Sequence, residues 1–316
     1  MLIFQDANRC QEEKVKPTVK IGVVVNPAAG LSRGASVGKQ VLEKLATTNH
    51  QILDLSGKDL QLAKANVEKA IQENLIEVLI LVGGDGMAQL GAQTCVNRAV
   101  AMALVPAGTG NDAAGILGMP LDNPMAALDL ILGNLTSHQQ IDAVSISHDG
   151  KVSIALGSAS AGFDALVNAR ANKMSWPKGP NRYYVAMLLE LAKFKPIKYK
   201  SVVDGVAKDF EAMLCVVSNT GVFGGGMLVV PDASVLDGQL DILLVKRMSR
   251  LKFVTIFPKV YKGTHVTDKD VEIFRARSVR IEAEGLPIYS DGEYVGQAPF
   301  EANVLPAALK VISASR

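Results

Sequence analysis

The feature that most constrains the fold is a run of five apolar residues, Val78–Val82, followed directly by Gly-Gly-Asp-Gly at residues 83–86. The run predicts a strand buried on both faces of a sheet, and open α/β sheets bind ligands at the carboxyl ends of such strands. Glycine has no Cβ, so backbone N–H groups can approach phosphate oxygens closely there. Phosphate-binding backbone beside the carboxylate of Asp85 favours phosphoryl transfer.

Strand and helix patterns alternate through the first half of the chain. The predicted strands are Lys20–Val25, Gln51–Leu55, Val78–Val82 and Ala101–Val105. The helical spacing of apolar residues covers Ala35–Ala46, Leu60–Gln72 and Met87–Arg98. This alternation predicts a parallel sheet covered by helices on both faces, and we expect it to form an α/β domain over residues 18–138.

After residue 138 the pattern changes to short β-type runs separated by glycine and Asp-Gly turns. The predicted strands are Ala143–Ser147, Val152–Ala155, Ser201–Val203, Ala212–Val217, Leu240–Val245 and Ser278–Glu282. One helical stretch, Tyr183–Ala192, interrupts them. Such a pattern is typical of antiparallel sheets, so we expect a β-rich domain over residues 139–302.

Composition excludes several classes of protein. The charged fraction is 20% and the net charge +2, which is too mild to indicate nucleic-acid binding. The three cysteines, Cys10, Cys95 and Cys215, lie far apart and form no CxxC pair, which argues against a disulfide framework or a zinc site. The chain also shows no signal-peptide pattern and no membrane-spanning run, so we expect a cytoplasmic protein, at most peripheral to a membrane.

Three loops follow predicted parallel strands and should meet at one edge of the sheet. They are Asn26–Gly30, Gly83–Gly86 and Pro106–Asp112. A single glycine-rich turn is weak evidence, but three on neighbouring βα units favour a phosphate site at that edge. The spacing matches neither the GxxxxGK[ST] loop nor the GxGxxG fingerprint of dinucleotide-binding folds.

In combination the loops resemble the diacylglycerol kinase catalytic-domain family, which includes bacterial lipid kinases and sphingosine kinases. The shared pattern is Asn-Pro-x-x-Gly, then Gly-Gly-Asp-Gly, then Pro-x-Gly-Thr-Gly-Asn-Asp. Further blocks of the family pattern resemble Gly162–Ala165, Gly224–Gly226, Pro231–Ala233, Asp237–Asp241 and Asp291–Glu293. Gly-Gly-Asp-Gly alone also occurs in NAD kinases and phosphofructokinase-like enzymes, so it is the combination that carries the resemblance.

The resemblance implies an NAD-kinase/phosphofructokinase-like nucleotide domain and a β-rich domain that binds the lipid. The C-terminal segment, about 303–316, would return to pack on the first domain. The implied activity transfers the γ-phosphoryl group of ATP, with Mg²⁺, to a lipid hydroxyl. Diacylglycerol is the first candidate acceptor and a sphingoid base the second. Peripheral contact with the inner face of the membrane and a homodimer are both left open.

Individual residues carry over from the family pattern. The implied ATP-contacting residues are Asn26, Gly30, Ser56, Gly84, Asp85, Gly86, Gly108, Thr109, Asn111 and Arg182. Asp291 and Glu293 match a pair assigned to base catalysis and metal handling in bacterial members. The sphingosine-kinase pattern instead places the base at the position of Asp85 in this sequence. The carboxylate of Asp237 and the carbonyl groups of Ser234 and Gln239 match a structural magnesium site.

The chain departs from the family after Gly-Gly-Asp-Gly. Where the family has Thr and Glu, this sequence has Met87 and Leu90. Two alternatives to a lipid kinase therefore stay open: a soluble-substrate kinase of the NAD-kinase type, and a nucleotide- or lipid-binding protein without turnover. Asp112 fits either a helix cap or a site residue. The basic residues between Lys193 and Lys200 are read as a solvated surface in preference to a membrane contact.

Overall fold

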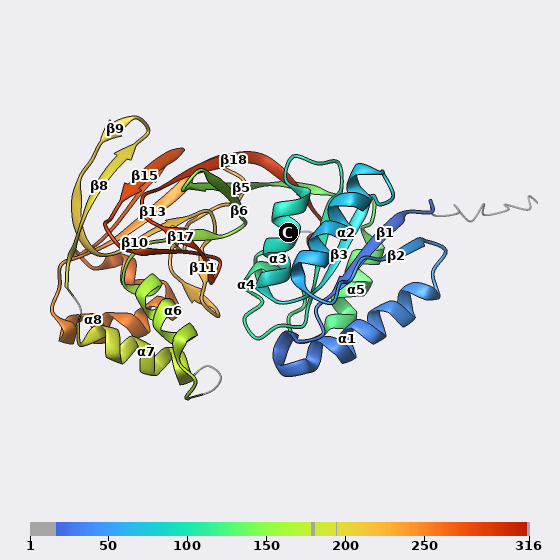
Figure 1. Ribbon diagram of the computed structural model, residues 1–316, viewed down its shortest axis with the longest axis horizontal. Coiled ribbons are helices and arrows are strands. Elements are labelled where there is room, and N and C mark those ends of the chain that lie inside the picture. The colour runs from blue at the N-terminus through green and yellow to red at the C-terminus, as the bar shows by residue number, and fades with distance from the viewer. Residues whose placement is uncertain (1–16, 178–180, 194, 315–316) are drawn as a thin grey trace, which may run out of the picture.

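The computed structural model describes residues 17–177, 181–193 and 195–314 (Figure 1). In its N-terminal part, parallel strands lie in the order β4-β3-β1-β2. They are β1 (Lys20–Val25), β2 (Gln51–Asp54), β3 (Val78–Gly83) and β4 (Ala101–Pro106). All residues of β3 and β4 are buried, because helices cover both faces of the sheet.

Five helices surround this parallel sheet. They are α1 (Ala29–Ala46), α2 (Leu60–Gln72), α3 (Asp85–Cys95), α4 (Asp112–Ile116) and α5 (Pro124–Gly133). The predicted bounds of α2 are correct, since Asp59 caps it by accepting a hydrogen bond from the Leu62 N–H. The expectation that the first helix starts at Ala35 was wrong. The helix already begins at Ala29, whose N–H donates to the Asn26 carbonyl oxygen.

The C-terminal part is antiparallel and confirms the predicted fold class. Its longer strands are β5 (Gln139–His148), β6 (Lys151–Ala155), β8 (Ile197–Val203), β10 (Phe210–Ser218), β13 (Leu240–Lys246), β14 (Val271–Ala276), β15 (Ser278–Glu282), β17 (Glu293–Gln297) and β18 (Phe300–Val311). The shorter ones are β7 (Ser158–Ser160), β9 (Val206–Ala207), β11 (Val222–Phe223), β12 (Met227–Leu228) and β16 (Pro287–Ser290).

The expectation of a single helix in this half was wrong. The structure has α6 (Phe163–Lys173), α7 (Asn181–Leu191) and α8 (Arg250–Ile256), and the 3₁₀ segments η1 (Phe257–Lys262) and η2 (Thr264–Thr267). Helix α6 has only three buried residues along its eleven, so its apolar spacing is weak in the sequence. Helix α8 is too short to give a periodic signal, and Ser249 caps it by accepting from the Lys252 N–H.

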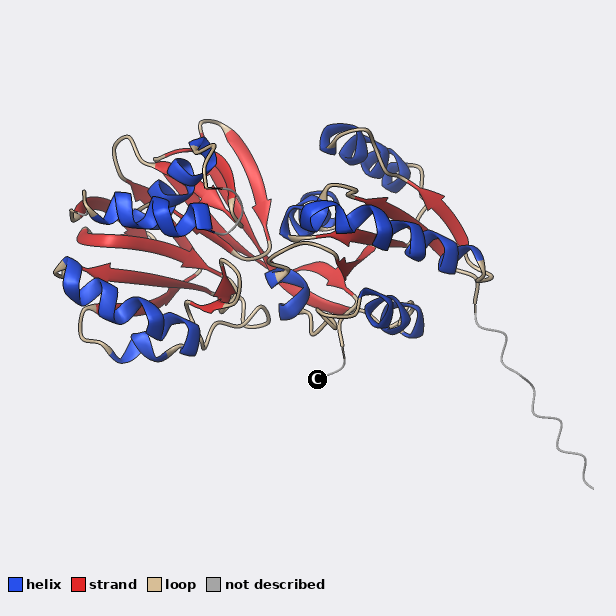
Figure 2. Cartoon of the chain, turned by 90° about the horizontal axis from the view of Figure 1, so that it is seen from below, coloured by secondary structure: helices blue, strands red, loops and turns tan. Residues whose placement is uncertain are grey.

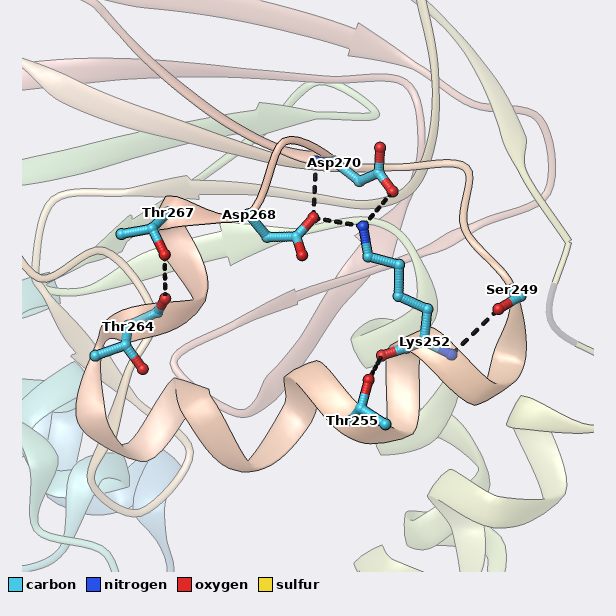
Figure 3. Close-up of polar contacts among 7 residues, drawn as sticks. All are labelled: Ser249, Lys252, Thr255, Thr264, Thr267, Asp268 and Asp270. Carbon is cyan, nitrogen blue, oxygen red and sulfur yellow. Dashed lines mark hydrogen bonds and ion pairs between the residues drawn. The ribbon is translucent and has the colours of Figure 1, made fainter.

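The three helices α6, α7 and α8 lie on one face of the antiparallel sheet, the face toward the viewer in Figure 2. Beneath them, Phe163 of α6 and Phe253 of α8 pack edge to face with ring centroids 5.0 Å apart. Lys252 extends from α8 to Asp268 and Asp270, at 2.6 Å from each carboxylate (Figure 3). This ion-pair network fastens α8 to the connection between η2 and β14.

Strands β5 and β18 join the two parts into one sheet. They pair antiparallel over most of their length, and the last two residues of β18 also pair in parallel with β4. Leu309, Val311 and Ile312 consequently belong to the hydrophobic core of the N-terminal part. At this crossing the buried carboxylate of Asp142 accepts hydrogen bonds from the N–H groups of Gly238 and Ala307. Among the described residues, no helix is both long and apolar enough to cross a bilayer.

Candidate active site

The three glycine-containing loops touch one another at the carboxyl ends of β1, β3 and β4. A Cβ on Gly30, which has a φ of +55°, would lie 2.3 Å from the Ala107 carbonyl oxygen. A Cβ on Gly108 would lie 2.4 Å from the Gly84 Cα. Both contacts are closer than real side chains allow, so glycine is required for the loops to approach. The predicted meeting of the loops at one edge of the sheet is therefore present.

The loop after β4 is held by the side chain of Asn111. Its Oδ1 accepts from the Gly108 N–H at 2.9 Å, and its Nδ2 donates to the Gly108 carbonyl oxygen at 3.0 Å. Asn111 is buried and adopts a left-handed φ of 58°, which asparagine tolerates better than most residues. Its amide thus shapes the loop, while the neighbouring Thr109 is exposed.

A cavity of about 440 Å³ opens beside the first loop, between α1 and the ends of β1 and β2. Its lining includes the apolar side chains of Val25, Pro27 and Leu42 and the polar residue Ser56. The Ser56 hydroxyl accepts from the Val25 N–H at 3.0 Å, which ties the end of β2 to the end of β1. Asn26, at the end of β1, accepts from the Ala28 N–H through its Oδ1. The lining also includes the charged residues Lys39, Glu43 and Asp54, so the cavity offers both apolar and charged groups to a ligand.

Asp85 is the first residue of α3 and lies under the loop after β4. Its Oδ1 accepts from the Ala113 N–H at 3.0 Å, so this carboxylate caps the neighbouring helix α4. A Cβ on Gly110 would come within 2.7 Å of the other oxygen, Oδ2. Burial is the main cause that raises the pKa of Asp85, and the negative charge of Asp112 adds to it.

Asp291 occupies the tight turn between β16 and β17 with a φ of 48°. Its Oδ1 accepts from the Ser158 N–H at 2.8 Å, and its Oδ2 accepts from the N–H groups of Leu156 and Gly157 at 3.1 and 3.2 Å. Burial raises the pKa of Asp291 most, these donors oppose the rise, and the charge of Asp85 adds to it. The charge of Asp85 is the smallest of these causes, so the two carboxylates, one from each part of the molecule, lie within electrostatic range of each other.

Two predicted site residues lie apart from this pair. Glu293 is exposed at the start of β17, opposite Ser290 in the hairpin. Arg182 lies in α7, with its guanidinium carbon 5.3 Å from the centre of the Tyr183 ring. The structure describes no hydrogen bond or ion pair between Arg182 and the glycine loops. Residues 178–180, which precede it in the resemblance, lie outside the described residues.

The predicted magnesium turn contains Ser234, Asp237 and Gln239. Asp237 Oδ1 accepts from the Gln239 N–H at 3.0 Å, while its Oδ2 faces Arg275 with 3.7 Å between Oδ2 and Nη1. Nearby, Asp241 Oδ2 is buried and has no hydrogen-bond partner among the described residues. Carboxylate oxygens beside backbone carbonyl groups, as in this turn, are ligands that suit a hard cation. Arg275 already supplies positive charge next to Asp237.

Comparison with known proteins identifies the family. The family model described as "Diacylglycerol kinase catalytic domain" matches residues 20–146, and the model described as "YegS C-terminal NAD kinase beta sandwich-like domain" matches residues 157–313. A Mycobacterium tuberculosis protein named diacylglycerol kinase is 34% identical over 295 residues, which cover 93% of this chain and 94% of that protein. The chain belongs to the diacylglycerol kinase family.

Other members of the family agree with this assignment. A Bacillus subtilis diacylglycerol kinase is 25% identical over 88% of this chain and 91% of its own length. The crystal structure of a diacylglycerol kinase from Bacillus anthracis superposes with a TM-score of 0.69 at 21% identity, covering 93% of this chain and 96% of that chain. A second structure from the same organism reaches a TM-score of 0.76 at 22% identity. At these identities the structures establish the shared fold.

The departure from the family pattern has a structural explanation. Met87 and Leu90 are each only 3% exposed and pack into the core of the N-terminal part from α3. The Met87 side chain lies against Gly83, where an added Cβ would be 2.4 Å from the Met87 Cγ. In this member of the family the two positions therefore contribute packing at the base of the phosphate loop, and Asp85 is the acidic residue in the first turn of α3.

Sequence reasoning missed several polar residues around Asp291. Asn219 is fully buried; its N–H donates to the Gly157 carbonyl oxygen at 2.7 Å and its Nδ2 to the Leu156 carbonyl oxygen at 2.9 Å. It thereby positions the segment whose N–H groups hold Asp291. Thr220 is buried beside it. The signal was a run of polar residues, 218–220, at the end of the apolar strand β10.

Proposed function

We propose that this protein is an ATP-dependent lipid kinase that transfers the γ-phosphoryl group to the hydroxyl of diacylglycerol, with a sphingoid base as the second candidate acceptor. The observation that carries the proposal is the convergence of the three glycine loops beside the carboxylate of Asp85, with Asp291 of the C-terminal part within electrostatic range. Backbone N–H groups are suited to a triphosphate, and a carboxylate with a raised pKa is suited to accept a proton near neutral pH.

The chemistry follows from these groups. Backbone N–H groups around Gly84 and Thr109 hold the phosphates, and the cavity beside Ser56 takes the nucleoside. The acceptor oxygen forms a bond to the γ-phosphorus, its proton passes to a carboxylate of the pair, and the bond to the β-phosphate oxygen breaks to release ADP. Mg²⁺ bound with the triphosphate neutralises charge on the phosphoryl oxygens. The carboxylate of the pair that does not take the proton is available to hold that ion.

Contact with a lipid surface is proposed through the helical face of the C-terminal part. Exposed apolar side chains gather there on α7 and α8, including Tyr184, Leu188 and Leu251 at 53%, 59% and 78% exposure. Exposed basic residues accompany them at Arg247, Arg250, Lys259 and Lys262. Apolar side chains edged by positive charge suit an anionic bilayer. Flotation of the protein with anionic vesicles, with neutral vesicles and without vesicles tests this contact. If the floating fraction holds as much protein without vesicles as with either kind, the proposed contact is contradicted.

One assay separates the proposed function from its rivals. The purified protein is incubated with γ-labelled ATP and, in parallel, with diacylglycerol, a sphingoid base, NAD and no acceptor. A labelled lipid supports the proposal and identifies the acceptor, whereas labelled NAD supports the soluble-substrate kinase. Absence of any labelled product from folded protein that still binds ATP would replace the proposal by the binding-protein alternative.

A further inference from the structure

Asp112 makes an unusual pair of contacts between the two parts of the molecule. It lies in the first turn of α4, directly after the phosphate loop. Its Oδ2 accepts from the Gly225 N–H and its Oδ1 from the Gly226 N–H, each at 2.8 Å. Both glycines belong to the tip of the β11–β12 hairpin in the C-terminal part. One carboxylate therefore joins segments more than a hundred residues apart in sequence.

The hairpin tip is shaped to bind an anion. Gly224, Gly225 and Gly226 have φ values of 72°, 83° and 88°, a conformation that side-chain-bearing residues rarely adopt. An added Cβ on Gly225 or Gly226 would meet nothing within 4 Å, so their glycines are required by backbone conformation and not by lack of space. Successive N–H groups in such a conformation point into one concavity and bind negative charge. Here the charge is the Asp112 carboxylate.

Helix capping does not account for Asp112. The Ala113 N–H at the start of α4 is already bonded to Asp85, and both Asp112 oxygens are directed to the hairpin. The residue before it, Asn111, makes no side-chain cap. Of the two readings that the sequence leaves open, a contact within the site is the one that the geometry favours.

The contact is continuous with both carboxylates of the candidate active site. On the N-terminal side, Asp112 adjoins Ala113, whose N–H is held by Asp85. On the C-terminal side, the chain leading into β11 begins with Asn219, which donates to Gly157. The Gly157 N–H in turn donates to Asp291 at 3.2 Å. A shift of the hairpin relative to α4 would thus move Asp291 relative to Asp85.

We propose that Asp112 and the Gly224–Gly226 tip form an interdomain clasp, with Asp112 as a positioning residue that fixes the placement of Asp291 relative to Asp85. The effect of the clasp on turnover rests on the proposed kinase function. Its effect on how closely the two parts of the molecule are held together does not depend on that function. Its two N–H donors also offset the charge of Asp112 beside the site expected to receive an anionic triphosphate.

The test compares Asp112→Asn and Asp112→Ala with Asp122→Asn. Asp122 is an exposed acid of the same region for which the described residues show no hydrogen bond or ion pair. Hydrogen bonds to a charged group contribute about tenfold to a hundredfold in an equilibrium constant, so the Asp112 variants should lose roughly tenfold or more in kcat. Affinity for a non-hydrolysable ATP analogue should stay within about threefold, because the loop N–H groups remain.

Two structural readouts accompany the kinetics. Amide exchange in the hairpin tip should accelerate in the Asp112 variants, and the radius of gyration from small-angle scattering should rise, while Asp122→Asn matches the parent in both. Unchanged exchange and scattering would overturn the clasp whether or not the protein phosphorylates a lipid. A loss confined to ATP-analogue affinity, with closure unchanged, would instead make Asp112 a nucleotide ligand and also overturn it.

Discussion

The two sides of the candidate site differ in how their polar groups are held. On the N-terminal side, short loops follow adjacent parallel strands, and close backbone approach at Gly30 and Gly108 brings them together. On the C-terminal side, Asp291 is held by N–H groups of residues 133 to 135 positions earlier in the chain. The first arrangement is local and visible in sequence motifs, whereas the second depends on the pairing of distant strands.

The two carboxylates differ in the same way. Asp85 uses Oδ1 to cap α4, and hydrogen bonds from the backbone of Ala113 and Asn111 oppose the rise of its pKa. Asp291 has both oxygens engaged by backbone donors, which favour its charged form against the effect of burial. A protonated carboxylate cannot accept the substrate proton, so turnover should fall on acidification. Because each pKa is raised, this fall should begin at a higher pH than the usual pKa range of an aspartate.

The largest expected effect separates these two carboxylates. If Asp291 is the base, Asp291→Asn should reduce turnover by about 10²- to 10⁴-fold while affinity for an ATP analogue holds. The amide nitrogen would also face backbone N–H donors, so thermal unfolding and calorimetric nucleotide binding serve as controls. A fall in turnover of less than about tenfold, with a larger fall for Asp85→Asn, would transfer the role of base to Asp85.

The second prediction concerns Asp164, a carboxylate buried within the C-terminal part. Burial raises the pKa of Asp164, at the start of α6, to about 6. The folded-state pKa of Asp164 lies above its unfolded-state value. The neutral carboxyl therefore makes its full contribution to stability near pH 4, and this contribution is lost as the pH rises through 6. Asp164→Asn should therefore be more stable than the parent at pH 8, by at most about 3 kcal/mol for a shift of roughly two units.

Urea denaturation at pH 8, 6 and 5 measures this difference. The advantage of Asp164→Asn should narrow steadily toward pH 5, because the parent becomes protonated. Asp149→Asn, at an exposed Asp-Gly turn of the same part, is the matched control. A stability difference that does not change with pH would contradict the assignment.

The third prediction tests the proposed magnesium turn of the C-terminal part, at Ser234, Asp237 and Gln239. Asp237→Ala should lower the melting temperature in Mg²⁺ buffer and flatten its dependence on Mg²⁺ concentration, since a ligand of the native state stabilises by mass action. Arg275→Gln removes the competing positive charge and should steepen that dependence. If both variants respond to Mg²⁺ as the parent does, the turn is stabilised by Arg275 alone.

The smallest effect is expected where the chain departs from its family. We predict that the parent binds a non-hydrolysable ATP analogue, and that Met87→Thr changes the affinity by less than about threefold, because Met87 packs into the core. Gly108→Ala is the contrasting variant, since its Cβ would collide with Gly84. If the folded parent protein gives no heat of binding at millimolar nucleotide, the ATP site is absent, and a lipid-binding or inactive protein is favoured over a kinase.

Much of the fold was predictable because its determinants are local. The bounds of Leu60–Gln72 and the occurrence of most of the short β-type runs follow from apolar spacing, a capping aspartate and turn residues. Helices α6 and α8 were missed because one buries few side chains and the other is very short. Their positions depend on packing against the antiparallel sheet, which spacing along the chain does not encode.

By itself the sequence determined the glycine loops, the acidic residue in their midst and the resemblance to a lipid kinase family, because strand, turn and phosphate-binding chemistry operate over a few residues. Only the tertiary structure decided that Asp291 comes within electrostatic range of Asp85, that Asp112 contacts the hairpin tip and that Met87 faces the core. The physical reason is that these carboxylates need hydrogen-bond donors, and most of the donors lie in loops and turns that folding brings in from distant segments.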